Sequence, residues 1–432
     1  MSAFAENAAT EITMTATQAM QLAGTLVEAG DLEHAEQILT MTPKMGNVVL
    51  EIERWFLLGQ IAQRQGDYDA AIKIYQKILD DQPDLARVRF ELATCYMHAR
   101  YWARADYHLR LAMAGKDLPD DAKSVMNYYR YIVRQNKNWN IWFNVGVAPD
   151  NNVNNASGGT EVYNHMWGTF YRKLDDPEQA IGTNLTLGGN YEFKLSNQWR
   201  LKSEVSIYSN VYDKSEYDDL YLGFATGPRF VWTRGDVWFA PMVTRRWYGW
   251  ERYNWSGGAR LDMNYDFTRR LSGGLYLRTT KNDYDMYGDW LNGYTYSGNM
   301  RLTYSFGASM YANFYAGITR EDTTMPLYSY WQPLLSIGFG AELPWGFHVY
   351  LEPSVYWGMY DKARSVLNRD GYWTDIQERS VTQRYSVSMS NNKFDVWGFV
   401  PTLTFSYTRR DSNIWQREFD KFSAEFTMRQ RF

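Results

Sequence analysis

The sequence predicts a fold in two parts, an N-terminal tetratricopeptide-like α-solenoid followed by a 14-stranded antiparallel outer-membrane β-barrel. Three observations predict it. Turns recur at near-even spacing after Trp139, the segments between them alternate apolar and polar residues, and residues 16–136 have a helical period with an internal repeat. Short turns at one rim and longer loops at the other are typical of transmembrane barrels.

The first fifteen residues carry a different signal. Ala3-Phe4-Ala5 has the small-x-small form of a signal-peptide cleavage site. We therefore expect residues 1–15 to be the tail of a signal peptide and a disordered N-terminus, followed by a periplasmic repeat domain over 16–136 and the barrel over 137–432.

The helical part contains a repeat. A shift of 34 residues brings Leu58 onto Leu92 and Ala71 onto Ala105, and a weaker unit around Gly30 precedes both. Stacked repeats form a concave groove that commonly binds an extended segment, although a simple packing spacer is the alternative. The best-matched unit has the tetratricopeptide spacing at Trp55, Leu58, Gly59, Ile61, Gly66, Asp67, Tyr68, Ala71, Tyr75, Leu79 and Pro83. Helix phase places the following candidate client-binding residues in the groove: Arg54, Arg64, Arg87 and Arg89.

The barrel part is divided by short turns near residues 197, 235, 270, 307, 345 and 392, at intervals of 38, 35, 37, 38 and 47 residues. Each interval fits two strands and a loop. The predicted strands are 139–148, 180–195, 198–212, 219–233, 236–249, 253–268, 270–281, 291–306, 309–320, 329–343, 346–359, 382–390, 394–408 and 418–432. Fourteen is even, as in bacterial single-chain barrels, and the last strand ends on Phe432, which resembles the signal that the barrel-assembly machinery reads.

Alternation within the strands separates a lipid face from a lumen face. Ile181, Leu187 and Tyr191 share one side of a strand, while Asn184 and Glu192 share the other. Runs of about 9–11 residues cross a membrane when tilted. We expect the following side chains to face the lumen and to contact cargo weakly: Arg200, Lys202, Glu204, Tyr311, Asn313, Tyr315, His348, Tyr350 and Glu352.

Composition excludes several classes. The mean hydropathy of −0.51 and dispersed charges exclude a helical membrane protein, and 17% aromatic residues fit the girdles of a barrel. The net charge is −4 and the basic residues form no stripe along the sequence, so nucleic acid is not expected as a partner. Cys95 is the single cysteine, so no intrachain disulfide forms. We find no motif for catalysis, a cofactor or a nucleotide, and we predict that the protein is not an enzyme.

The loop after the first strand carries an asparagine-rich motif. Asp150, Asn152, Asn154 and Glu161 have a calcium-loop spacing, but a strand precedes them and asparagines often form hydrogen bonds with their own backbone. We therefore favour an ordered loop over a metal site. The motif residues are Pro149, Asp150, Asn151, Asn152, Asn154 and Asn155.

The segment from Val145 to Ala156 closely resembles the surface lipoprotein assembly modulators, also called type XI secretion proteins, as do Arg384–Ser390 and Phe405–Ile414. The turn at 391–393 departs from that family by being less basic and aromatic. The resemblance covers nearly the whole chain. It implies an outer-membrane translocator that carries surface lipoproteins or soluble haem- and iron-acquisition proteins, with clients that end in a small β-barrel.

The expected function is therefore export of a protein client from the periplasm, with repeats that engage the client or a chaperone. Expected partners are that client, the barrel-assembly machinery, periplasmic chaperones and outer-membrane lipid. The alternatives are an exopolysaccharide export porin with periplasmic repeats, a solute porin, or a surface adhesin whose specificity lies in the loops at 281–291 and 361–381.

Overall fold

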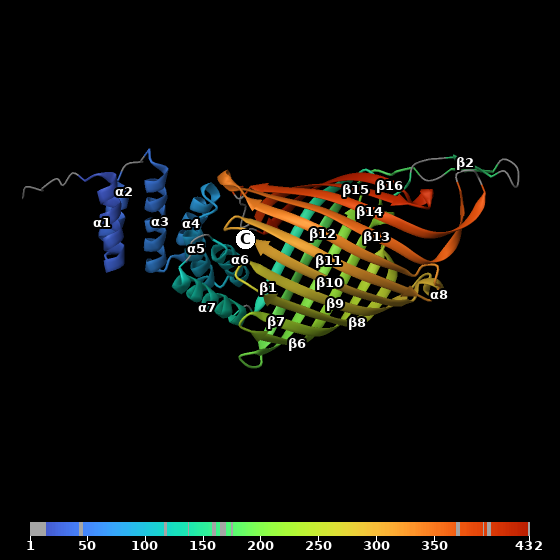
Figure 1. The fold of residues 1–432 in the computed structure, drawn as a ribbon, viewed down its shortest axis with the longest axis horizontal. Helices are drawn as coiled ribbons and strands as arrows, with labels where there is room; N and C mark the ends of the chain where they lie inside the picture. The colour runs from blue at the N-terminus through green and yellow to red at the C-terminus, as the bar shows by residue number, and fades with distance from the viewer. Residues whose placement is uncertain are drawn as a thin grey trace, which may run out of the picture.

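The structure is a computed structural model that describes residues 14–42, 46–115, 119–136, 138–157, 161–164, 170–173, 176–368, 372–391, 393–394 and 399–430. In this part of the chain a stack of helices and a closed β-barrel follow one another along one long axis (Figure 1). The predicted fold class is confirmed. The possible signal-peptide tail and the terminal Phe432 lie outside the described residues.

The helical domain consists of three helix pairs and a last helix. Gly30 and Gly66 end the first helices of the first two pairs with φ of 86° and 84°, a left-handed conformation that glycine adopts without strain. Asp31 and Asp67 then begin the next helices by accepting backbone N–H groups. The helices are α1 (Ala16–Ala29), α2 (Leu32–Met41), α3 (Val48–Gln65), α4 (Tyr68–Asp81), α5 (Ala86–His98), α6 (Trp102–Met113) and α7 (Asp120–Asn136).

The third helix pair has an arginine where the first two have a glycine. Arg100 follows α5 with φ of 63°, a conformation that costs a non-glycine residue about 1 kcal/mol. We expect Arg100→Gly to raise the free energy of unfolding of the helical domain by about 1 kcal/mol. Urea unfolding followed by the helical circular-dichroism signal measures it. Gly66→Arg is the reverse control and should lower stability; no gain from Arg100→Gly would contradict the argument.

The helical core is made of side chains from several repeats. Tyr75, Leu92, Tyr96 and Leu109 are fully buried around Cys95. Burial raises the pKa of the Cys95 thiol to about 12. The thiol therefore stays protonated near neutral pH and is unreactive in the folded domain.

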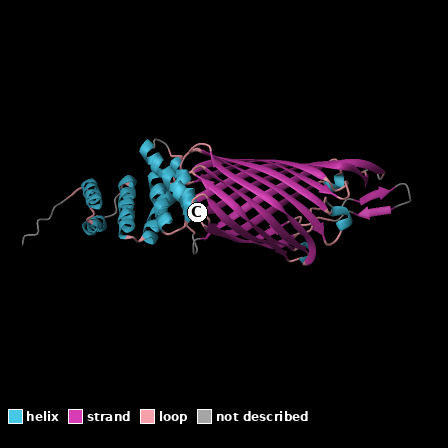
Figure 2. Ribbon diagram, turned by 90° about the horizontal axis from the view of Figure 1, so that it is seen from below, coloured by secondary structure: helices cyan, strands magenta, loops and turns pink. Residues whose placement is uncertain are grey.

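In the described chain, fourteen strands close the barrel in the order β1-β16-β15-β14-β13-β12-β11-β10-β9-β8-β7-β6-β5-β4, with antiparallel neighbours throughout. A separate hairpin, β2 (Glu161–Asn164) and β3 (Phe170–Lys173), lies in the first loop, beyond the far rim (Figure 2). The barrel strands are β1 (Trp139–Asp150), β4 (Ala180–Lys194), β5 (Trp199–Tyr212), β6 (Asp219–Trp232), β7 (Gly235–Tyr248), β8 (Glu251–Asp266), β9 (Leu271–Tyr284), β10 (Gly293–Ser305), β11 (Met310–Thr323), β12 (Tyr330–Glu342), β13 (Phe347–Leu367), β14 (Trp373–Asn391), β15 (Phe399–Ser412) and β16 (Phe419–Gln430).

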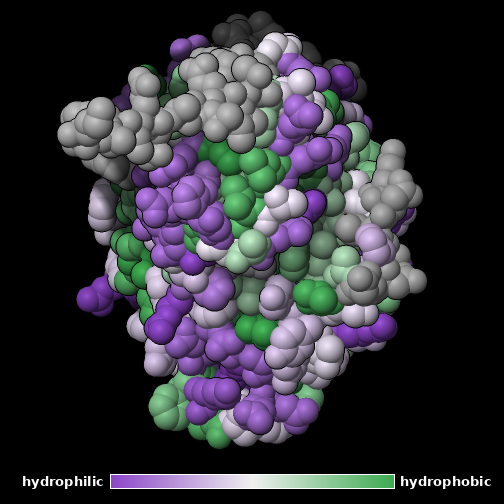
Figure 3. All heavy atoms as spheres, turned by 90° about the vertical axis from the view of Figure 1, so that its left-hand side faces the viewer, coloured by the Kyte–Doolittle hydropathy of each residue, from purple (hydrophilic) through white to green (hydrophobic). Residues whose placement is uncertain are grey.

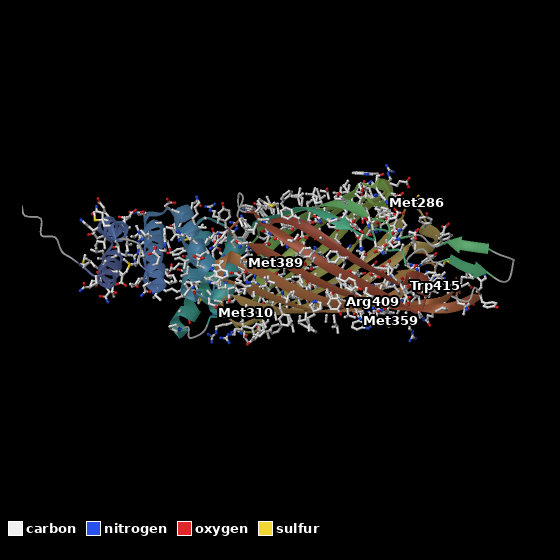
Figure 4. All side chains as sticks on the ribbon, turned by 90° about the horizontal axis from the view of Figure 1, so that it is seen from above. Met286, Met310, Met359, Met389, Arg409 and Trp415 are labelled. Atoms are coloured by element: carbon white, nitrogen blue, oxygen red, sulfur yellow. The ribbon has the colours of Figure 1, made fainter. Side chains whose placement is uncertain are left out.

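The outer face of the barrel is apolar. Ile181, Tyr191 and Phe193 of β4 are exposed, whereas Glu192 between them is buried, as the alternation predicts. Exposed methionines reach both ends of this face. Met310 and Met389 lie near the helices, while Met359 lies toward the far end (Figure 4). This is the surface of a barrel that meets lipid. Among the described helices, none is both long and apolar enough to span a membrane.

The lengths of the connections differ less between the two rims than predicted. Gly249 and Trp250 join β7 to β8 at the long-loop rim in a tight turn with φ of 57° and 64°. Both positive values match the turn type that fits strand twist, so no long loop is required there. The predicted strands 346–359 and 382–390 are also too short. β13 and β14 run on past that rim. Beyond a bulge they pair from Ala363 opposite Gln377 to Leu367 opposite Trp373, so part of the predicted loop 361–381 is a projecting hairpin.

Candidate functional site

The helical domain covers the short-turn rim of the barrel through a buried ion pair. Glu342 ends β12, and the Arg89 guanidinium of α5 donates to it at 2.5 Å. The Arg89 side chain is 0% exposed and also donates to the Pro83 carbonyl at 2.9 Å. The Tyr107 hydroxyl of α6 donates to the other oxygen of Glu342. Removing one partner of such a buried pair is strongly destabilising.

A second anchor lies at Asp266, the last residue of β8. Arg130 of α7 contacts its carboxylate at 2.7 Å, and Arg134 donates to the same group and to the Thr233 carbonyl at 2.8 Å. Burial alone would lower the pKa of Arg130, but the charges of Asp106 and Asp266 raise it, so this arginine stays charged. One acidic strand end thus fixes α7 across the barrel mouth.

The end of α7 also enters a charge network of the lumen. Arg200 on β5 donates to the backbone carbonyl of Gln135 at 2.7 Å and to Glu192 of β4 at 3.3 Å. Arg229 of β6 approaches Glu192 at 2.6 Å and Asp236 of β7 at 3.2 Å. Two arginines and two carboxylates are therefore balanced at the point where the helices meet the wall.

Other described contacts with this rim are polar, and some of them are exposed. The Ser309 hydroxyl donates to Asp84, and Lys393 approaches Asp81 at 2.7 Å with both side chains about half exposed. Seen from the helical end, hydrophobic residues stand in small groups among hydrophilic ones (Figure 3). The domain therefore presents a mixed surface on the side away from the barrel.

Deeper in the lumen, the cations are paired as well. Lys202 and Arg260 lie 4.0 Å and 4.6 Å from the centroid of the buried Trp238 ring. Glu204 accepts Arg260 at 2.9 Å and approaches Lys202 at 3.5 Å. Arg260 also pairs with Asp262. On this side of the described wall, these two cations and two carboxylates therefore balance one another.

The other predicted lumen residues form a polar and aromatic group on β11 and β13. Asn313 donates to the Tyr350 hydroxyl at 3.2 Å, and the Tyr311 hydroxyl lies 3.4 Å from the His348 ring nitrogen. Glu352 accepts the Ser336 hydroxyl at 2.9 Å, and Tyr315 is half-buried on the same face. Aromatic and amide groups dominate this side of the wall. Contact of these residues with cargo stays a prediction.

The four predicted groove residues separate into different environments. Arg64 and Arg87 are exposed, and both lie near the carboxyl of Glu91. Burial raises the pKa of this carboxyl, and the charges of the two arginines lower it. Arg54 is half-buried and donates to the Leu39 carbonyl at 2.8 Å, which ties α3 to α2. Arg89 does not lie in an open groove, because it is the buried anchor at the barrel rim. Helix phase missed this because its partner Glu342 is remote in sequence.

The loop-one motif is held by its own backbone. Asn152 accepts the Ala156 N–H at 2.8 Å, and Asn154 accepts the Glu178 N–H at 3.0 Å while donating to the Asp176 carbonyl. Asn155 has φ of 49°, the left-handed conformation expected for it. These bonds form an ordered loop. The side chain of Glu161 lies outside the described part, and the described residues contain no group of three or more potential metal ligands.

The functional residues that the sequence did not identify are the acidic strand ends. Glu342 and Asp266 each close a strand next to a short turn, and Glu192 lies on the lumen face near another. A usable signal was present, since an acidic residue at a strand end beside a short turn requires a partner, and the helix just before the first strand carries arginines. These arginines are Arg130 and Arg134 on α7.

Comparison with known proteins identifies relatives of this arrangement. A family model described as surface lipoprotein assembly modifier matches residues 139–432, and a tetratricopeptide-repeat model matches residues 62–122. A surface lipoprotein assembly modifier of Pasteurella multocida is 22% identical over 86% of this chain and 75% of its own length. The surface lipoprotein assembly modifier 1 of Neisseria meningitidis is 29% identical over 48% and 41%. A hemophilin secretion modulator of Acinetobacter baumannii is 21% identical over 87% and 78%.

Proposed function

The chain belongs to the surface lipoprotein assembly modifier family, and we propose on that basis that it moves a protein client across the outer membrane. The client is a surface lipoprotein or a soluble haem- or iron-acquisition protein that ends in a small β-barrel. One observation carries the proposal: a repeat domain of a peptide-binding class is fixed by buried ion pairs across the mouth of a closed barrel. A small-solute porin has no use for that arrangement.

The proposed path begins at the helical domain. With the short-turn rim in the periplasm, as in bacterial barrels, the repeats receive the client or its chaperone there. Arg54, Arg64 and Arg87 are the remaining candidates for groove contacts. Charges of both signs line the lumen, and carboxylates already neutralise cations such as Arg229 and Arg260, so the client is held weakly. This balance also disfavours export of a polysaccharide of one charge sign.

Direction comes from the client itself. Folding of a small domain releases about 5–15 kcal/mol, and a client that folds outside cannot return through the barrel. The proposal includes no nucleotide, cofactor or covalent step. The barrel-assembly machinery inserts the translocator, and periplasmic chaperones keep the client unfolded until it reaches the repeats.

A secretion assay tests this function. The probe is an epitope-tagged secreted protein or lipoprotein with a C-terminal β-barrel, expressed with or without the chain in a laboratory Gram-negative host. We expect the tag on intact cells or in the medium to increase at least tenfold when the chain is present. A heat-modifiable band in gel electrophoresis shows that the barrel has assembled. An assembled barrel with the probe retained in the periplasm overturns the proposal for that client.

A further inference from the structure

Within the described residues, the seam between β1 and β16 has the fewest paired positions of any junction in the barrel wall. In the described chain these strands pair at five positions, from Asn144 opposite Arg429 to Asp150 opposite Ser423. On its other side β1 pairs with β4 at twelve positions, and β10 pairs with β11 at thirteen. Backbone pairing is what holds strands together in lipid, so a junction with few pairs costs less to open than a fully paired one.

The pairing is interrupted inside the seam. Ala148 and Pro149 pair with β4 but with no residue of β16, and Pro149 has no N–H to donate. Gly146 permits the closest approach, because a Cβ there would lie 2.6 Å from the Phe426 carbonyl oxygen. Backbone pairing between the two strands is therefore continuous only from Asn144 to Val147.

Side chains of the loop-one motif replace the missing backbone bonds. Lys421 approaches Asp150 at 3.1 Å, the Phe422 N–H donates to Asn151 at 2.9 Å, and Asn152 donates to the Asp420 carbonyl at 3.4 Å. We call these contacts the seam clasp; Asp150, Asn151 and Asn152 form it with residues of β16. Asn152 is 2% exposed. Individual side-chain bonds of this kind break and re-form more readily than a continuous strand pairing.

The lumen face of the seam is polar and incompletely bonded. Asn184 on β4 donates across β1 to Glu425 on β16. The side-chain oxygens of Asn144 and Asn184 are buried without a hydrogen-bond partner among the described residues. Buried polar groups left unsatisfied weaken a junction, so the inner side of the seam adds little to its stability.

We propose that the β1–β16 seam is a lateral gate that takes up an extended strand of the exported protein. This rests on the proposed function and names the route within it. Opening exposes backbone N–H and C=O groups on both strands, and in lipid these must find partners. An extended client strand supplies them by β-augmentation. The seam clasp closes the wall again when the strand has left.

A disulfide across the seam tests the gate. Val147 and Phe426 are paired and face outward, so Val147→Cys with Phe426→Cys closes the seam covalently. Met300→Cys with Ala316→Cys is the matched control in β10 and β11. Cys95 is buried and does not interfere. With the tagged probe of the secretion assay, we expect oxidation of the seam pair to reduce export at least tenfold and a reductant to restore it, with the control pair unaffected.

The outcomes separate the two proposals. Normal export through a fully oxidised seam pair overturns the gate and leaves the proposed function in place. Absence of export by the unmodified, assembled chain overturns the proposed function and the gate that depends on it.

Amide hydrogen exchange of the unmodified chain in lipid nanodiscs serves if the cysteine pair does not assemble. We expect β16 amides facing β1 to exchange at least tenfold faster than amides within the β10–β11 pairing, and Asn152→Ala to increase that difference. Equal protection of the two junctions overturns the gate.

Discussion

Glu342→Ala is expected to loosen the helical domain from the barrel while both parts stay folded. The change leaves the fully buried Arg89 guanidinium without its carboxylate. Loss of one partner from a buried ion pair costs about 3–5 kcal/mol. The cost falls on docking, because Glu342 pairs with His348 at the end of β12 through its backbone, which the substitution leaves in place.

A disulfide reporter across the rim measures the release. Asp84 and Ser309 are in contact between the two parts, so Asp84→Cys with Ser309→Cys forms a cross-link when the domain is docked. We expect Glu342→Ala to slow its formation about tenfold, and Asp266→Ala to add to the effect because it removes a separate anchor.

The matched control for docking is Lys393→Ala. Its ion pair with Asp81 also joins the two parts, but both side chains are about half exposed. Such pairs contribute about 0–1 kcal/mol, so the cross-linking rate should hardly change. Equal effects of the Lys393 and Glu342 substitutions would show that the buried pair does not hold the domain.

The barrel could be predicted from sequence because lipid and lumen impose a period of two on every strand they share. That rule fails beyond the membrane. Ala363–Leu367 and Trp373–Gln377 pair beyond the rim, where no lipid imposes that alternation, and the segment has the composition of a loop. The predicted strands 236–249 and 253–268 already left a short connection between them, and the backbone conformation shows that it is the two-residue turn at Gly249–Trp250.

The helical repeats were predictable because small residues and turn glycines recur at fixed spacing. The short connection to the first strand indicated that the domain sits against the short-turn rim, but the residues that dock it there were not predictable. Arg89 and Glu342 belong to different elements far apart in the chain, and each has an unremarkable sequence environment. Helix phase showed that Arg89 leaves α5 on one face, but it could not show that the barrel covers that face. The loop-one motif was recognised as ordered, whereas its bonds to β16 required the closed barrel.

Gly59→Ala and Gly24→Ala are expected to change stability in opposite directions, although each adds one methyl group to a helix. A Cβ at Gly59 would lie 2.5 Å from the Tyr75 ring, which is fully buried and donates its hydroxyl to Gln63. The ring has no free space to move into. Such overpacking costs about 1–3 kcal/mol, which exceeds the gain of about 0.5–1 kcal/mol from replacing a helical glycine.

Gly24 provides the matched control, since nothing lies within 4 Å of a Cβ built there. Gly24→Ala should therefore stabilise α1, while Gly59→Ala lowers the free energy of unfolding of the helical domain and Gly59→Val lowers it further. Urea unfolding followed at the helical circular-dichroism signal measures all three, and the heat-modifiable band of the barrel should stay unchanged. If Gly59→Ala also stabilises, the Tyr75 ring is free to shift. The tight crossing of α3 and α4 would then not be what fixes the repeat geometry that the docked domain presents to a client.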